Sequence, residues 1–129
     1  MRAEELLESI LATSPMVRAA SIYPGSGEPV YRPRGGADPR RAGGEYWEEA
    51  VVNPTLIDLL RRTGAARHEG LDYLLVRYRD GWLLLLPFEH GHAAIAFEPT
   101  ADPIPTVPTL RQLCEHHGFG FAVVSWDRG

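Results

Sequence analysis

Residues 71–98 carry the clearest alternation of apolar runs and polar breaks in the chain. The apolar runs cover 71–79, 82–88 and 92–98. Asp80-Gly81 separates the first two, and this dipeptide is a strong hairpin signal because a type I′ turn needs positive φ at both central residues. We expect Gly91 in the second break to take positive φ without a Cβ penalty. The pattern therefore predicts a three-stranded antiparallel meander.

The strands of this meander differ in how they are expected to be covered. The runs 82–86 and 93–97 are apolar at every position, so both of their faces should be buried. The strand 71–79 has one apolar face and one face that becomes charged. The first face holds Leu74, Val76 and Tyr78, and the second holds Tyr73, Leu75, Arg77 and Arg79. A strand with one face that is apolar over only half of its length suits the edge of a sheet. Such an edge must be covered by another element or paired with another strand.

The start of the chain predicts a helix followed by two strands. Residues 3–14 place apolar side chains at helical spacing, and Pro15 ends the pattern. Strands are expected at 17–23 and 28–32. The second of these should lie at a sheet edge, because Pro29 has no amide hydrogen to donate to a neighbour.

A further helix is predicted before the meander. Asn53-Pro54 resembles an N-cap with proline at the first helical position, and Gly64 resembles the glycine that follows a helix. The apolar positions of this helix include Leu56, Leu59 and Leu60. Residues 45–52 also have helical spacing, and whether one bent helix or two are present stays open.

The last helix is expected to begin at Thr106 as its cap and to end at Gly118, with Leu110, Leu113 and Cys114 facing inward. The element order is therefore α-β-β-α-β-β-β-α. Strands that are apolar on both faces need helices on both faces, so we expect an α/β fold: a three-layer α/β/α sandwich around one antiparallel five-stranded sheet. Residues 120–126 add either an extra C-terminal strand or a packed tail. The whole chain, 1–129, is expected to form one domain.

Composition narrows the classes of function. The net charge is −4 and the pI about 5.7. The chain therefore lacks the excess of positive charge that is typical of proteins binding nucleic acid or an anionic membrane. No apolar run reaches the ~18 residues of a membrane span. The single cysteine, Cys114, fits a reducing compartment, and the acidic start is unlike a signal peptide, so we expect a cytoplasmic protein. All 13 basic residues are arginine, which indicates the coding bias of a prokaryote.

One segment of this acidic chain is locally basic. Residues 33–44 have no apolar side chain larger than alanine, which predicts a mobile loop. The arginines in or beside it are Arg32, Arg34, Arg40 and Arg41. A contact with phosphate or an acidic partner is the alternative to a solvated linker.

Candidate residues for chemistry are few. His90 and His92 flank Gly91, but a zinc or copper site needs at least one more ligand, so exposed hairpin histidines are the favoured interpretation. Cys114 lies on the apolar face of a helix, where a free cysteine behaves as a small hydrophobe. The sequence has no nucleophile elbow, phosphate-binding loop or dinucleotide fingerprint. We therefore expect neither an enzyme nor a bound cofactor or metal.

The order of elements, with a helix inserted between the second and third strands, resembles the Roadblock/dynein light-chain family, in its bacterial type. The resemblance rests on the opening helix, the helix 53–64 and the meander with its Asp80-Gly81 turn. It implies a homodimer in which the strands 71–79 pair across a two-fold axis and the helices 54–63 pack together. It also implies a platform for small Ras-like GTPases. Some bacterial relatives stimulate GTP hydrolysis without donating an arginine, so Arg77 and Arg79 are not nominated as arginine fingers.

The predicted interface residues are thus Tyr73, Leu75, Arg77 and Arg79 on the strand and Leu56, Leu59 and Leu60 on the helix. Two alternatives remain from other classes of function. One is a small-ligand sensor, with Tyr73, Trp82 and the histidines lining a pocket. The other is a protein similar to a secretion chaperone, which would bind an extended peptide.

Overall fold

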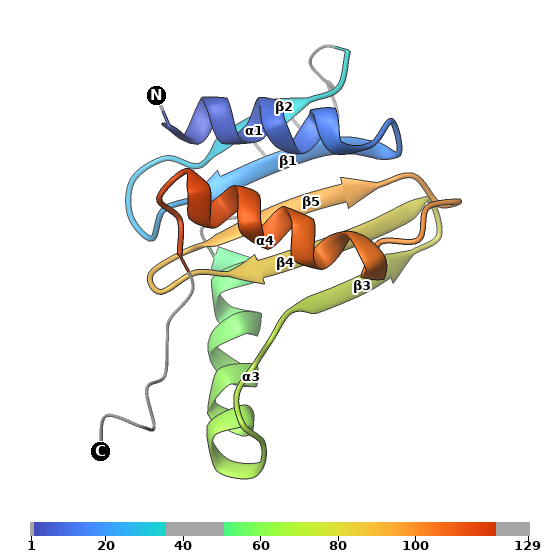
Figure 1. Cartoon of the computed structure of the whole chain (residues 1–129). Helices are drawn as coiled ribbons and strands as arrows, with labels where there is room; N and C mark the ends of the chain where they lie inside the picture. Colours follow the sequence, from blue (N-terminus) through green and yellow to red (C-terminus); the bar gives the residue numbers. More distant parts are fainter. Residues whose placement is uncertain (1, 36–50, 121–129) are drawn as a thin grey trace.

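The chain forms a five-stranded antiparallel sheet in the order β2-β1-β5-β4-β3, as the computed structural model shows (Figure 1). The structure describes residues 2–35 and 51–120. The strands are β1 (Val17–Tyr23), β2 (Val30–Pro33), β3 (Leu74–Tyr78), β4 (Gly81–Pro87) and β5 (His92–Phe97). The sequence prediction of a meander and of two edge strands is confirmed: β3, β4 and β5 are neighbours, and β2 and β3 lie at the edges.

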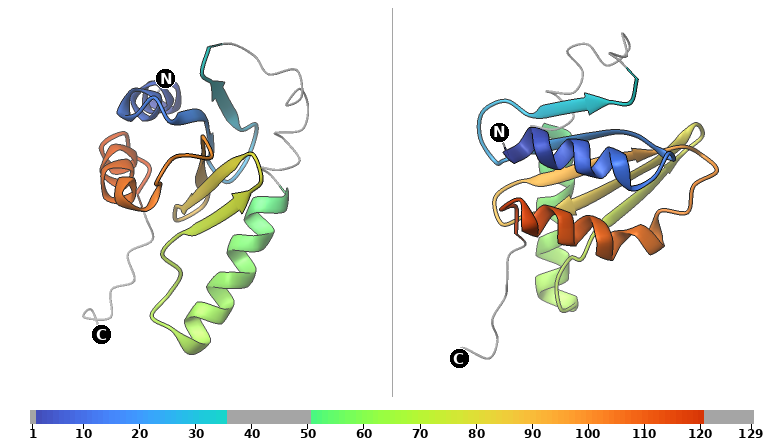
Figure 2. Two further views of the ribbon diagram at one scale, coloured as in Figure 1. Left: turned by 90° about the vertical axis from the view of Figure 1, so that its right-hand side faces the viewer. Right: turned by 45° about the horizontal axis from the view of Figure 1, so that its top comes forward.

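Helices lie on both faces of the sheet, as expected for an α/β/α arrangement. They are α1 (Arg2–Thr13), α3 (Asn53–Arg67) and α4 (Val107–His116), and a 3₁₀ turn, η3 (Ile104–Thr106), precedes α4. Figure 2 shows α1 and α4 side by side on one face and α3 on the other. The main core lies under α1 and α4, where Leu6, Ile10, Ile95 and Leu110 are fully buried. Each such side chain contributes about 1.5–3 kcal/mol to stability through burial.

The layer formed by α3 is much thinner. Among the residues of α3, only Asn53, Ile57 and Gly64 are buried. In Figures 1 and 2 the helix crosses the sheet beside β4 and β3 and then continues beyond the β3 edge. Most of α3 therefore has none of the described strands beneath it.

Both turns of the meander differ from the sequence prediction. Neither Gly81 nor Gly91 has positive φ, and among the described residues only other glycines have it. The prediction of a type I′ turn at Asp80-Gly81 is therefore wrong. The β3–β4 turn consists of Arg79 and Asp80, and it is closed by the pair Tyr78 and Gly81. Glycine is needed at position 81 because a Cβ there would lie 2.5 Å from the Phe97 carbonyl oxygen. The glycine at position 81 thus reflects the close approach of the β5 backbone at Phe97, not the geometry of the turn.

The ends of α3 also differ from their prediction. Val52 already has helical dihedral angles, φ −67° and ψ −55°, and no side chain caps the helix, so Asn53 is not an N-cap. Gly64 lies within the helix, which continues to Arg67. A Cβ on Gly64 would lie 3.1 Å from the Gly70 carbonyl carbon. The glycine therefore allows the chain that returns to β3 to pass close to the helix.

The predictions at the C-terminal end have mixed outcomes. Thr106 does not cap α4, because its own dihedral angles are helical and its hydroxyl donates to the Pro103 carbonyl. Gly118, with φ +87°, follows the helix as expected. The loop predicted at 33–44 begins later than expected, because Pro33 belongs to β2. Its residues 36–44, the helical segment 45–50 and most of the strand or tail at 120–126 lie outside the described residues.

Candidate partner-binding surface

Most of the large apolar side chains that are exposed in the described residues lie on α3 or next to it. Leu56, Leu59 and Leu60, here called the leucine stripe, are 40%, 53% and 41% exposed. On α3 they share one side at i, i+3, i+4 spacing. Leucines are usually buried, and a contiguous exposed group of them marks an interaction surface more often than a free face.

The β3 edge that α3 overhangs has no partner on its outer side in the described part of the sheet. Because Tyr78 and Gly81 close a two-residue turn, they form a hydrogen-bonded pair, and the pairs then alternate along the ladder. Val76 consequently directs its backbone groups toward β4, whereas Leu75 and Arg77 direct theirs to the open edge. The open edge offers donors and acceptors at the odd-numbered positions.

The side chains predicted on that strand are mostly engaged within the chain. Tyr73 and Leu75 pack against the core under α4. The Arg77 guanidinium donates to the Pro99 carbonyl at 3.0 Å and lies 4.9 Å above the Trp82 ring. Arg79 lies in the exposed turn. The structure thus brings the backbone of this strand to the open edge, whereas its odd-numbered side chains are mostly in contact with other parts of the chain. That these side chains belong to an interface stays a prediction.

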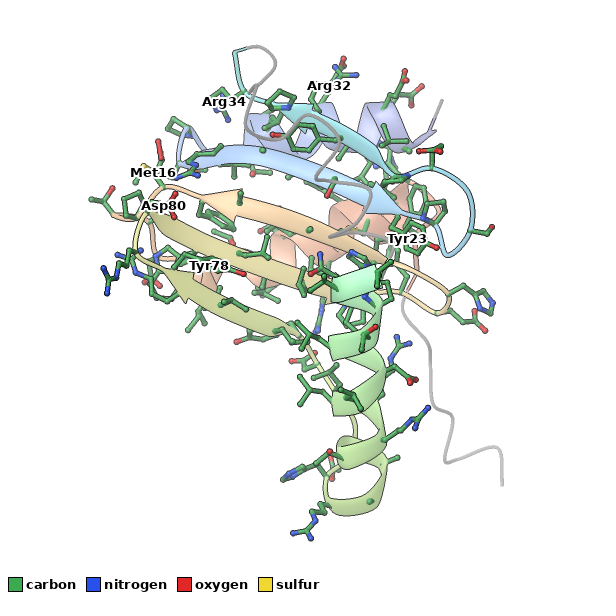
Figure 3. All side chains as sticks on the ribbon, turned by 180° about the vertical axis from the view of Figure 1, so that it is seen from behind. Met16, Tyr23, Arg32, Arg34, Tyr78 and Asp80 are labelled. Carbon is green, nitrogen blue, oxygen red and sulfur yellow. The ribbon has the colours of Figure 1, made fainter. Side chains whose placement is uncertain are left out.

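The other face of β3 was not singled out from the sequence. Tyr78 is 55% exposed there (Figure 3), and Leu74 and Val76 are half-buried. The face is continuous with the side of the sheet on which α3 lies. The alternation along the strand already separated these residues from their neighbours, but it could not show which set faces the main core.

The arginines of the predicted basic loop that the structure describes are held by α1 and β1 (Figure 3). Arg32 pairs with Glu8 at 2.9 Å. The Arg34 guanidinium donates to the carbonyls of Leu11 and Ser14, at the C-terminal end of α1, and to that of Val17 in β1. Carbonyls at a helix end favour a cation, so Arg34 has a structural role. Arg40 and Arg41 lie outside the described residues.

The residues considered for chemistry lie apart. His90 is exposed, but His92 is only 1% exposed, so the prediction of two exposed hairpin histidines is wrong for His92. Its ring lies 5.8 Å from that of Tyr23. Within residues 2–35 and 51–120, no group of three or more His, Cys, Asp or Glu side chains is arranged to hold a metal ion. Burial raises the pKa of Cys114 to about 12, which removes thiolate character near neutral pH.

The pocket predicted for a small-ligand sensor, lined by Tyr73, Trp82 and the histidines, is not formed. Tyr73 and Trp82 pack on the side of the sheet covered by α4. His90 and His92 instead line a cavity beside α3, together with Tyr23 and Ile57. No helix in the described part of the chain is long and apolar enough to cross a membrane.

The fold matches solved structures closely. The chain is similar to a Roadblock/LC7 domain from Streptomyces avermitilis, with a TM-score of 0.67 and 16% identity, covering 87% of this chain and 91% of that one. The chain has the Roadblock/LC7 fold.

Two further structures with the Roadblock/LC7 fold are MglB proteins. A structure described as MglB with a tetrameric arrangement gives a TM-score of 0.64 and 16% identity, covering 90% of each chain. The gliding protein MglB from Thermus thermophilus gives 0.63 and 13%, covering 90% of this chain and 82% of that one. No protein-family model matches the sequence, and no curated protein matches it either. The shared Roadblock/LC7 fold confirms the resemblance seen in the order of elements.

Proposed function

We propose that residues 1–129 form one non-enzymatic regulatory domain that pairs with a second copy of itself and serves as a platform for a small Ras-like GTPase in the cytoplasm of a prokaryote. The pairing surface is the leucine stripe of α3 together with the open edge of β3. The observation that carries the proposal is the exposure of this stripe on a helix that extends beyond the sheet.

A second copy fits this surface for geometric reasons. A two-fold axis at the β3 edge pairs two identical open edges, which satisfies the outward donors and acceptors of Leu75 and Arg77 without leaving a new edge exposed. The same axis brings the two overhanging α3 helices together and covers their leucine stripes. One interface thus removes both exposed features.

The GTPase as partner comes from the resemblance to the Roadblock family, in which such domains act beside small GTPases. In this proposal the chain changes the state of a GTPase through contact, without contributing chemistry of its own.

Sedimentation of matched variants tests the pairing surface. Leu59→Glu places a charge on the leucine stripe and should yield a monomer. Ile104→Glu is the control, because Ile104 in η3 is equally exposed, at 54% against 53% for Leu59, but lies away from α3. A dimeric Leu59→Glu protein, or equal loss of dimer in both variants, would reject the surface.

Affinity capture from the native cytoplasm tests the partner. Recovery of a small GTPase that depends on added GTP or GDP, and that is identified by mass spectrometry, would support the platform role. Recovery that is the same with either nucleotide, or no recovery at all, would reduce the proposal to a dimer with a shared fold.

A further inference from the structure

A cavity of about 250 Å³ opens where the first turns of α3 meet the end of β1 and the start of β5. Its walls are formed by Tyr23, Pro54, Ile57, Arg61, His90 and His92. Figure 3 shows Tyr23 at the end of β1, beside the start of α3. Segments distant in the sequence thus meet around one opening on the face of the sheet opposite α1 and α4.

This cavity is separate from the proposed pairing surface. The α3 residues that line it, at positions 54, 57, 58 and 61, have the spacing of one helical face. The leucine stripe projects from the opposite side of α3, since a helix turns by about 100° per residue. A ligand in the cavity and a second copy on the leucine stripe would therefore contact different sides of the same helix.

The buried residues of the cavity lining are Ile57 and His92, whereas Asp58 and His90 lie at its exposed rim. Ile57 is 3% exposed and the His92 side chain only 1%, so both belong to the packed interior. Tyr23 and Pro54 are half-buried at its sides. The buried part of the lining suits the apolar body of a ligand better than a fully hydrated ion.

Arg61 supplies a positive charge to the cavity. Its Nη2 donates to the Phe88 carbonyl, which fixes the guanidinium in place. A guanidinium has five N–H donors, so this bond leaves others for a ligand. The acidic residue at the rim, Asp58, forms an exposed ion pair with Arg62 at 2.9 Å. A fixed, planar guanidinium matches a carboxylate, with which it forms two parallel hydrogen bonds.

We propose that this cavity binds a small monocarboxylate with an apolar body. Arg61 pairs with the carboxylate, and Tyr23, Ile57 and the ring of His92 contact the apolar part. The volume is below the ~300–1,000 Å³ of ordinary ligand pockets, which limits the occupant to a single ring or a short chain. A phosphate is disfavoured, because Arg61 is the only arginine or lysine among the described residues of the lining and Asp58 would repel a second negative charge.

Calorimetric titration with three small probes tests the ligand class on the unaltered chain. Benzoate should bind. Benzamide, which has the same shape without the charge, should bind about tenfold more weakly or worse, a difference of about 1.4 kcal/mol. Inorganic phosphate should not bind. Equal affinity for benzoate and benzamide, binding of phosphate in place of benzoate, or no binding of benzoate at millimolar concentration would each overturn the proposal.

Arginine variants test the assigned residue. Arg61→Gln should lower the affinity for benzoate about tenfold or more. Arg67→Gln, on the same helix but outside the cavity, should leave it unchanged, and equal losses would overturn the assignment. Leu59→Glu should keep benzoate binding whatever its effect on pairing, so that failure of the dimer and failure of this site are told apart.

Discussion

Gly91 lies so close to the backbone of Tyr23 that a Cβ on the glycine would stand 1.9 Å from the Tyr23 carbonyl oxygen. The two residues pack the β4–β5 turn against the end of β1, where the Phe88 amide also donates to the Gly91 carbonyl at 2.7 Å. The contact leaves no room for any side chain at position 91. It also sets the position of the neighbouring histidine, His92, at the floor of the cavity.

Gly91→Ala should therefore be strongly destabilising. The obstacle is backbone rather than a flexible side chain, so β1 or the turn must move, at a cost of about 3 kcal/mol. We expect thermal unfolding to show a fall in Tm of about 10 °C. Gly120→Ala is the control, because nothing lies within 4 Å of a Cβ at that position. Similar Tm values for the two variants would contradict the close contact.

Leu75→Pro should abolish pairing through the open edge of β3. The substitution removes an amide hydrogen that points outward, while the hydrogen bonds of β3 to β4 use the even-numbered residues. Leu75→Ala removes the same side chain from the core but keeps the amide, so it is the matched control. Analytical ultracentrifugation should find a monomer for the first and a dimer for the second. A dimer in both would exclude the β3 edge.

The symmetry of the proposed pair restricts its register. A two-fold axis perpendicular to the sheet keeps the faces of both strands aligned, so residues opposite each other must be both even or both odd in number. The axis then lies midway between the two copies of one residue. Pairing of the full strand, Leu74–Tyr78, places Val76 opposite itself and Tyr78 opposite the partner's Leu74.

Val76→Cys should consequently form an intermolecular disulfide under mild oxidation, because opposed residues at such a site have Cα atoms within disulfide range. Cys114, the native cysteine, is buried and stays unreactive. Leu75→Cys should cross-link poorly, since it faces the partner's Arg77. Non-reducing electrophoresis measures both. Preferential cross-linking of Leu75→Cys would shift the axis by one residue while keeping the strand pair.

Cys114 should make stability fall at alkaline pH. Burial, with a smaller effect of the Glu115 carboxylate, raises the pKa of its thiol from 9.0 to about 12. Between pH 9 and about pH 12 the unfolded chain therefore binds fewer protons than the folded chain. The contribution of Cys114 to the free energy of unfolding is complete below pH 9 and is lost as the pH rises through this range. The slope reaches about 1.4 kcal/mol per pH unit. Urea unfolding of Cys114→Ala should show a flatter decline above pH 9, and identical slopes would contradict the shift.

Much of the fold was predictable because its signals are local. Apolar runs of strand length and the breaks between them located every described strand. The edge position predicted for β2 is confirmed, although Pro29, from which it was predicted, precedes the strand. The glycine positions were predictable but their reasons were not. Gly81 is required by the carbonyl of Phe97 and Gly91 by that of Tyr23, and neither partner can be recognised from the residues beside the glycine.

The surface was predictable only in part for a similar reason. Alternation along β3 divides its side chains into two sets, but only the register with β4, in which Leu75 lies opposite Leu84, shows which set meets the main core. The buried position of His92 likewise depends on β1. By contrast, the cavity-lining positions 54, 57, 58 and 61 lie within the predicted helix 53–64, and helical spacing alone places them on one face.

The overhang of α3 beyond β3 has a consequence for the cell. In the proposed pair, an isolated chain cannot cover the leucine stripe with its own sheet, so each copy completes the helical layer of the other. Part of the folding free energy then comes from association, and the melting temperature rises with protein concentration. The amount of this protein that a cell makes would then determine both its concentration and the stability of each molecule against unfolding.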